Sequence, residues 1–202
     1  MARAPRLSSL LKEVRACRAC AADLPHEPRP VVVAHASSRV LIIGQAPGRR
    51  VHDTGVPWND PSGDRLRGWL EMSREGFYDA SVLAIVPMGL CFPGSGKHGD
   101  LPPRSICAPR WHGALRQAMP DIRLTLLIGS YAQRYYLGDA CGATMADTIR
   151  QWRTHLPAYF PLPHPSPRNQ AWFKHHPWFE AEVLPALRQC LRDILPPAAQ
   201  PS

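Results

Sequence analysis

Two short polar loops hold the residues of this sequence that are best suited to chemistry. One is Gly44-Gln45-Ala46-Pro47-Gly48, and the other is His164-Pro165-Ser166-Pro167-Arg168-Asn169. A histidine can donate a hydrogen bond to an oxygen that gains negative charge during a reaction. Glycines let the backbone approach a ligand closely, and the amide of Gln45 can hold a water molecule. The two loops therefore predict a pocket that stabilises charge and positions water.

The elements that must position these loops follow from the pattern of apolar residues. Strands are predicted at residues 40–44, 82–86, 124–129 and 159–162. Helices are predicted at residues 8–22, from Ser62 onward, and at 104–119, 131–137, 145–153 and 178–195. Short apolar strands that alternate with helices indicate an α/β fold, a three-layer α/β/α sandwich around a central, mainly parallel four-stranded sheet. Ligands of such sheets bind beyond the carboxyl ends of the strands, so the two loops would form opposite walls of one site.

Length and composition limit the class of protein. With 202 residues, the chain is expected to form a single domain over residues 1–195, followed by a disordered tail at 196–202. No apolar stretch approaches the roughly 20 residues that span a bilayer, and no secretory signal is recognisable. We therefore expect a cytoplasmic monomer without a membrane partner.

The charge of the chain favours a polyanionic partner. The formal net charge is +8, and most of the 24 basic residues are arginines, whose guanidinium group binds phosphate oxygens in a forked geometry. An ordinary basic protein without such a partner is the alternative on charge alone.

The two loops together resemble the uracil-DNA glycosylase superfamily, whose first motif is a Gly-x-x-Pro turn and whose last motif begins with His-Pro-Ser. The resemblance extends from about Cys17 to Leu195. It implies a DNA-repair glycosylase that hydrolyses the N-glycosidic bond of uracil or another deaminated base in DNA. Such an enzyme must flip the base out of the duplex into a pocket.

The resemblance also implies roles for individual residues. His164 would stabilise the departing base, while Gly44, Ala46, Pro47 and Gly48 would form the floor of the pocket. Gly55-Val56-Pro57-Trp58 resembles the family's Gly-x-Pro-Phe, so the Trp58 ring would stack on the flipped base. Ser166, Arg168 and Asn169 lie where the family contacts DNA. The alternative for Trp58 is a position in the hydrophobic core, and the alternative for Arg168 and Asn169 is a solvated polar turn.

Two departures from the family pattern affect the expected chemistry. Relatives carry an Asp or Glu in the first motif to orient the attacking water, whereas this chain has Gln45 and Ala46. Gln45 could still position the water, and the nearby groups that could supply the missing carboxylate or base are His52, Asp53, Asp60 and Asp64. Of these, Asp60 is preferred, and Asp64 is expected in the first turn of a helix.

The second departure follows the strand at 82–86. The segment at 85–89 has no amide side chain where relatives place a base-reading Asn, so selectivity for uracil is not implied. A non-hydrolytic binder of uracil-containing or damaged DNA is the alternative function. An unrelated nucleotide-binding or metal-dependent enzyme is a third reading, but the chain lacks the phosphate-binding loops and the ligand clusters of such enzymes.

Four cysteines resemble the cluster ligands of iron–sulfur uracil-DNA glycosylases. Cys17 and Cys20 form a C-x2-C pair that is predicted on the first helix, and Cys91 and Cys107 form a second pair. The resemblance implies a 4Fe-4S cluster of structural function; a structural zinc, or chance spacing without a metal, are the alternatives. Cys141 and Cys190 have no partner pattern and are expected to be buried apolar residues.

Overall fold

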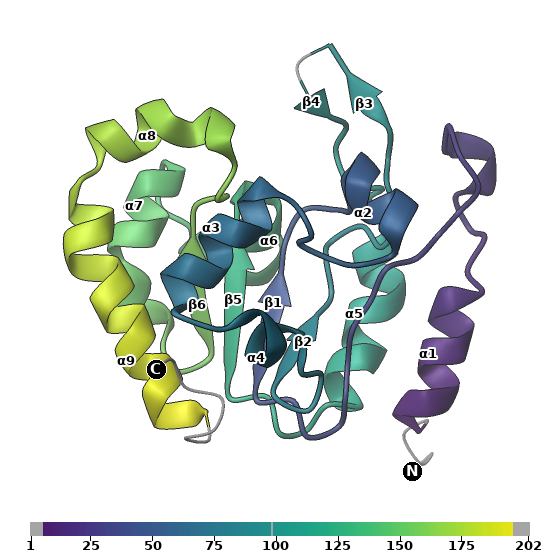
Figure 1. Ribbon diagram of the computed structural model, residues 1–202, viewed down its shortest axis with the longest axis horizontal. Helices are drawn as coiled ribbons and strands as arrows, with labels where there is room; N and C mark the ends of the chain where they lie inside the picture. The colour runs from purple at the N-terminus through teal and green to yellow at the C-terminus, as the bar shows by residue number, and fades with distance from the viewer. Residues whose placement is uncertain (1–5, 98, 196–202) are drawn as a thin grey trace.

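A four-stranded parallel sheet forms the centre of the computed structural model, which describes residues 6–97 and 99–195. Its strands are β1 Val40–Ile43, β2 Leu83–Ile85, β5 Leu124–Ile128 and β6 Tyr159–Leu162. The strand order is β2-β1-β5-β6, and every neighbouring pair is parallel. This sheet with its flanking helices confirms the predicted α/β fold (Figure 1). The tail predicted at 196–202 lies outside the described residues.

Hydrophobic cores on both faces of the sheet make the three layers. Alternate residues of β1 point to opposite faces, so Val40 and Ile42 pack in one core and Leu41 and Ile43 in the other. The first core is covered mainly by α3 Pro61–Leu70, α4 Arg74–Tyr78, α7 Met145–Arg150 and α9 Leu184–Ile194. The second is covered by α1 Leu7–Arg15, α5 Cys107–Gln117 and α6 Ser130–Leu137.

Several short elements were absent from the sequence-based prediction or had different bounds. The additional elements are α2 Arg49–Thr54, α4, α8 Gln170–His175, and the hairpin β3 Ser95–Gly96 with β4 Gly99–Asp100. The predicted first helix was too long: it ends at Arg15, and a separate 3₁₀ turn covers Ala21–Asp23. The last helical region begins with a π-helical turn, Phe179–Val183. Further 3₁₀ turns cover Gly138–Ala140, Trp152–His155 and Pro167–Asn169.

The strand order creates a crevice at the carboxyl edge of the sheet. β2 lies on one side of β1 and β5 on the other, so the winding of the chain reverses between β1 and β5. In open α/β sheets, ligands bind at this reversal point. Figure 1 shows α2 and the β3–β4 hairpin beyond this edge, beside the loop that leaves β1. Among the described residues, no helix has the length and apolar character needed to cross a bilayer.

Candidate active site

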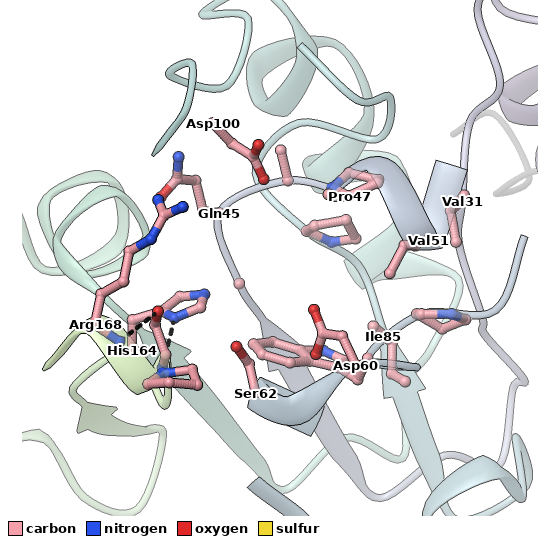
Figure 2. Close-up of a pocket in the computed structure, with 18 residues that line it drawn as sticks. Val31, Gln45, Pro47, Val51, Asp60, Ser62, Ile85, Asp100, His164 and Arg168 are labelled. Atoms are coloured by element: carbon pink, nitrogen blue, oxygen red, sulfur yellow. Dashed lines mark hydrogen bonds between the residues drawn. The ribbon is translucent and has the colours of Figure 1, made fainter. Parts of the chain in front are cut away.

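A cavity of about 320 Å³ opens at this crevice (Figure 2). The structure brings ten of the predicted site residues to its wall: Gly44, Gln45, Ala46, Pro47, Gly48, Trp58, Asp60, His164, Ser166 and Arg168. Asn169 lines an adjoining cavity of about 410 Å³, which shares His164 and Gln45 with the first and reaches the end of β5. The loops after β1 and β6 thus meet at one site, as their placement after parallel strands predicted.

The contacts of His164 define which of its ring nitrogens carries a proton. The backbone N–H of Ser166 donates to Nδ1 of His164 at 3.2 Å, so Nδ1 is an acceptor. Burial lowers the pKa of His164, and the nearby Asp60 and Asp100 oppose that effect only in part. The ring is therefore neutral near pH 7, and a neutral ring with an accepting Nδ1 carries its proton on Nε2. Asn169 Nδ2 donates to the His164 carbonyl at 2.8 Å and stabilises the loop.

Trp58 is held by several contacts from its own loop and from α3. Its backbone has φ of 55°, a left-handed conformation that non-glycine residues rarely adopt. Arg67 Nη1 donates to the Trp58 carbonyl at 3.2 Å, and the backbone of Gly63 lies so close that a side chain there would clash with the same carbonyl. The indole lies against Gly44, and its ring centroid is 5.7 Å from that of His164. Trp58 packs against the core and also lines the cavity.

Asp60 combines a structural contact with a position at the cavity. It is the N-cap of α3, and its Oδ1 accepts a hydrogen bond from Gly63 N–H at 2.8 Å. The helix therefore begins at Pro61 and not at Ser62, because Asp60 supplies the cap and Pro61 fits the first helical position. Figure 2 shows the Asp60 carboxylate facing into the cavity. Among the other predicted carboxylates, Asp64 lies in the first turn of α3, as its sequence position predicted. It forms an ion pair with Arg67.

The remaining two candidates for the missing carboxylate or base lie on α2. His52 packs beside the rings of His26 and Phe92, and Asp53 is exposed. Neither belongs to the described residues that line the 320 Å³ cavity. Asp60 is thus the member of the predicted set that reaches the site.

The site contains a second carboxylate that the sequence analysis did not identify. Asp100, on β4, lines both cavities, and its Oδ1 accepts a hydrogen bond from Ser95 Oγ at 2.9 Å. Its other oxygen would lie 3.1 Å from a Cβ at position 48, so Gly48 leaves room for it. Gln45 Nε2 donates to the Leu101 carbonyl at 3.3 Å and links the first motif to the strand that carries Asp100. The glycines at 96 and 99 were the available signal for a hairpin here.

Part of the cavity wall is apolar. Its residues come from the segment before β1, from α2 and the loop after it, and from the end of β2: Val31, Val51, Pro57, Ile85 and Pro87. No amide side chain follows β2 at this wall, in line with the sequence. A base that entered the cavity would contact its polar side near Gln45 and His164 and its apolar side near Ile85.

The four predicted cysteine ligands line one separate cavity between α5 and the segment after α1. Cys17 and Cys20 lie in the turn beyond the end of α1, not on the helix, because α1 ends at Arg15. Leu90 N–H donates to Cys107 Sγ at 3.4 Å, and the positive charge of the nearby Arg104 acts on Cys20.

Burial is the main cause of the raised pKa values of two of these thiols. Burial raises the pKa of Cys91 to about 12 and that of Cys107 to about 11. Within the described ranges, no three His, Cys, Asp or Glu side chains are placed to bind one common metal ion. A 4Fe-4S cluster makes a different demand, because each cysteine binds its own iron and the four sulfurs need not meet at one atom. The four thiols that line this cavity match the ligands of such a cluster in type and number.

Comparison with known proteins identifies the family. A model of the uracil DNA glycosylase superfamily matches residues 31–188, which is most of the chain, so the chain belongs to this superfamily. The structure is also similar to the solution NMR structure of a "putative Uracil DNA glycosylase" from Methanosarcina acetivorans. That likeness has 15% sequence identity and a TM-score of 0.46 and covers 79% of this chain and 94% of the other. The superfamily match carries the assignment and confirms the resemblance predicted from the two loops.

Proposed function

We propose that this protein is a DNA-repair glycosylase that hydrolyses the N-glycosidic bond of uracil or another deaminated base in DNA. The observation that carries the proposal is the pairing of Trp58 with a neutral His164 in one cavity, with Nδ1 of His164 occupied by Ser166. This arrangement offers an aromatic surface for a flipped base and an N–H donor for one of its oxygens.

The roles follow from the charges that develop as the bond breaks. The sugar becomes cation-like and the departing base gains negative charge on its oxygens. Nε2–H of His164 stabilises that charge, and Trp58 stacks on the base. The backbone at Gly44, Ala46, Pro47 and Gly48 forms the floor. The missing side chains of Gly44 and Gly48 leave room for the Trp58 ring and the Asp100 carboxylate.

A water molecule must then attack the sugar carbon. Asp60 accepts from Gly63 through Oδ1, which leaves its carboxylate oriented toward the cavity, and it is the proposed water-positioning residue. Gln45 assists through its amide oxygen, since its Nε2 donates to Leu101. Asp100 adds a second negative charge near the cation-like sugar, from the opposite side of the cavity.

DNA binding is proposed at the rim of the cavity. Ser166, Arg168 and Asn169 lie there, and Arg65 Nη1 donates to the Ser166 carbonyl at 3.4 Å, so basic groups surround the last motif. With a net charge of +8, this rim would bind phosphates with an affinity that decreases as salt increases. We further infer a monomer that acts in the cytoplasm; gel filtration tests the first point.

We propose that Cys17, Cys20, Cys91 and Cys107 hold a 4Fe-4S cluster. Bound there, the cluster would cross-link the segment after α1 to the start of α5 and to the chain beyond β2. Protein purified without oxygen should be brown and contain about four irons per chain. Zinc in place of iron, or metal-free folded protein, would contradict the cluster.

The alternative function is a non-hydrolytic binder of uracil-containing or damaged DNA, which the absence of a carboxylate from the first motif favours. One experiment separates the two functions. Labelled oligonucleotides with uracil, hypoxanthine or xanthine are incubated with excess protein and then treated with alkali, which cleaves at abasic sites. Cleavage of any of them supports the glycosylase, whereas retention of intact lesion-bearing DNA supports the binder.

A further inference from the structure

We infer that Trp111 is a fifth protein contact of the group held by the four cysteines, and that its indole N–H donates a hydrogen bond to a sulfur there. The inference rests on the proposed cluster and concerns its electronic properties. It assigns a positioning function to a side chain outside the cysteine set and outside the candidate active site.

The position of Trp111 on α5 places it beside the cysteines. Cys107 is the first residue of α5, and Trp111 follows four residues later. Side chains four residues apart lie one above the other on the same helix face. The indole accordingly lines the same cavity as Cys17, Cys20, Cys91 and Cys107.

The indole N–H has no acceptor within the described protein. Trp111 is 8% exposed, and its Nε1 is buried without a hydrogen-bond partner. The Arg110 guanidinium lies over the ring, 5.2 Å from its centroid, and covers it further. A buried donor that lacks an acceptor normally destabilises a protein, because it has lost its hydrogen bond to water. A sulfur-containing group in this cavity would supply the acceptor, since the cavity holds four thiols.

A donor at this place would complement the donors already present. Leu90 N–H donates to Cys107 Sγ at 3.4 Å, and Arg104 brings a positive charge near Cys20. Hydrogen bonds to cluster sulfurs stabilise the more negative, reduced state and raise the reduction potential. Removal of one such donor should therefore shift the potential to a more negative value and make the cluster easier to lose.

The test compares two conservative tryptophan replacements in the full chain, purified without oxygen. Trp111→Phe retains an aromatic ring and removes the N–H. Trp178→Phe makes the same chemical change at a partly buried tryptophan whose Nε1 atom is also buried without a partner. Trp178 contacts Trp172 and His176, away from the cysteines. Iron content, the reduction potential from spectroelectrochemistry and the rate of bleaching by a chelator are measured for each.

We expect Trp111→Phe to have a more negative reduction potential and severalfold faster bleaching, with Trp178→Phe unchanged from wild type. Equal values for all three proteins would overturn the inference. Wild-type protein that contains zinc or no iron would overturn both this inference and the proposed cluster. The proposed function is tested separately, by base release. If Trp111→Phe does not fold, pulsed EPR on reduced wild type with ¹⁵N-labelled indoles decides: coupling to an indole nitrogen supports the contact, and its absence refutes it.

Discussion

A methyl group at Gly44 should disturb the site through Trp58. A Cβ at position 44 would lie 2.8 Å from Trp58 Cζ2, roughly 0.7 Å closer than the shortest favourable carbon–carbon separation. Arg67 and Gly63 hold the Trp58 backbone on its other side, so the side chain has to take up the displacement. In Gly44→Ala the indole must therefore shift by most of that distance. Misplacement of a binding group by about 1 Å can decrease a rate about 10²-fold, so we expect base release to decrease about 10- to 100-fold.

The assay for Gly44→Ala is single-turnover base release with enzyme in excess, together with thermal unfolding. Gly68→Ala is the matched control, because a Cβ there would have no neighbour within 4 Å and the residue is exposed on α3. The control should release base at the wild-type rate and gain up to about 1 kcal/mol of helix stability. A folded Gly44→Ala protein within twofold of the wild-type rate would refute the assignment of Trp58 to the base-stacking position.

Further predictions concern charge stabilisation, water, folding and DNA affinity. His164→Ala should decrease the rate about 10²–10³-fold without unfolding the protein; a wild-type rate contradicts its role. Asp60→Asn retains an N-cap residue, so single-turnover kinetics should show slower base release without unfolding. Burial lowers the pKa of His112 from 6.5 to about 4, so the neutral ring stabilises the fold above pH 6.5 and this contribution is lost as the pH falls below it. The free energy of unfolding, measured with urea, should therefore decrease by about 2 kcal/mol between pH 7.5 and pH 5. The decrease should be smaller in His112→Phe. Fluorescence anisotropy should show DNA affinity decreasing steeply from low to physiological salt, and a constant affinity would contradict the phosphate-binding rim.

The sheet could be predicted because each strand is a short, mostly apolar segment. Val40–Ile43 and Leu124–Ile128 are buried along their whole length, which is what helices on both faces of a parallel sheet require. The helix α2 could not be predicted in the same way. Its six residues contain a single buried side chain, Val51, so they show no helical periodicity. Gly55, with φ of 73°, ends the helix and was the local signal.

The candidate site could be predicted in part. Parallel strands end at one edge, so residues directly after β1 and β6 had to meet, and Gln45 and His164 do line one cavity. Asp100 was not foreseeable from spacing, because a hairpin far along the chain carries it and the Gln45 contact with Leu101 holds that hairpin. The placement of Cys17 and Cys20 on α1 was wrong, since the helix ends before both. The tautomer of His164 depends on a backbone contact that only the folded loop provides.

The central claim is that the cavity lined by Trp58 and His164 accepts a deaminated base and releases it. Mass spectrometry of the small molecules formed when wild type acts on uracil-, hypoxanthine- or xanthine-containing DNA tests this most directly. The account predicts that wild type releases at least one of these as the free base and leaves an abasic strand, and that His164→Ala releases almost none. Lesion-bearing DNA that wild type binds tightly but leaves intact for every base would contradict it.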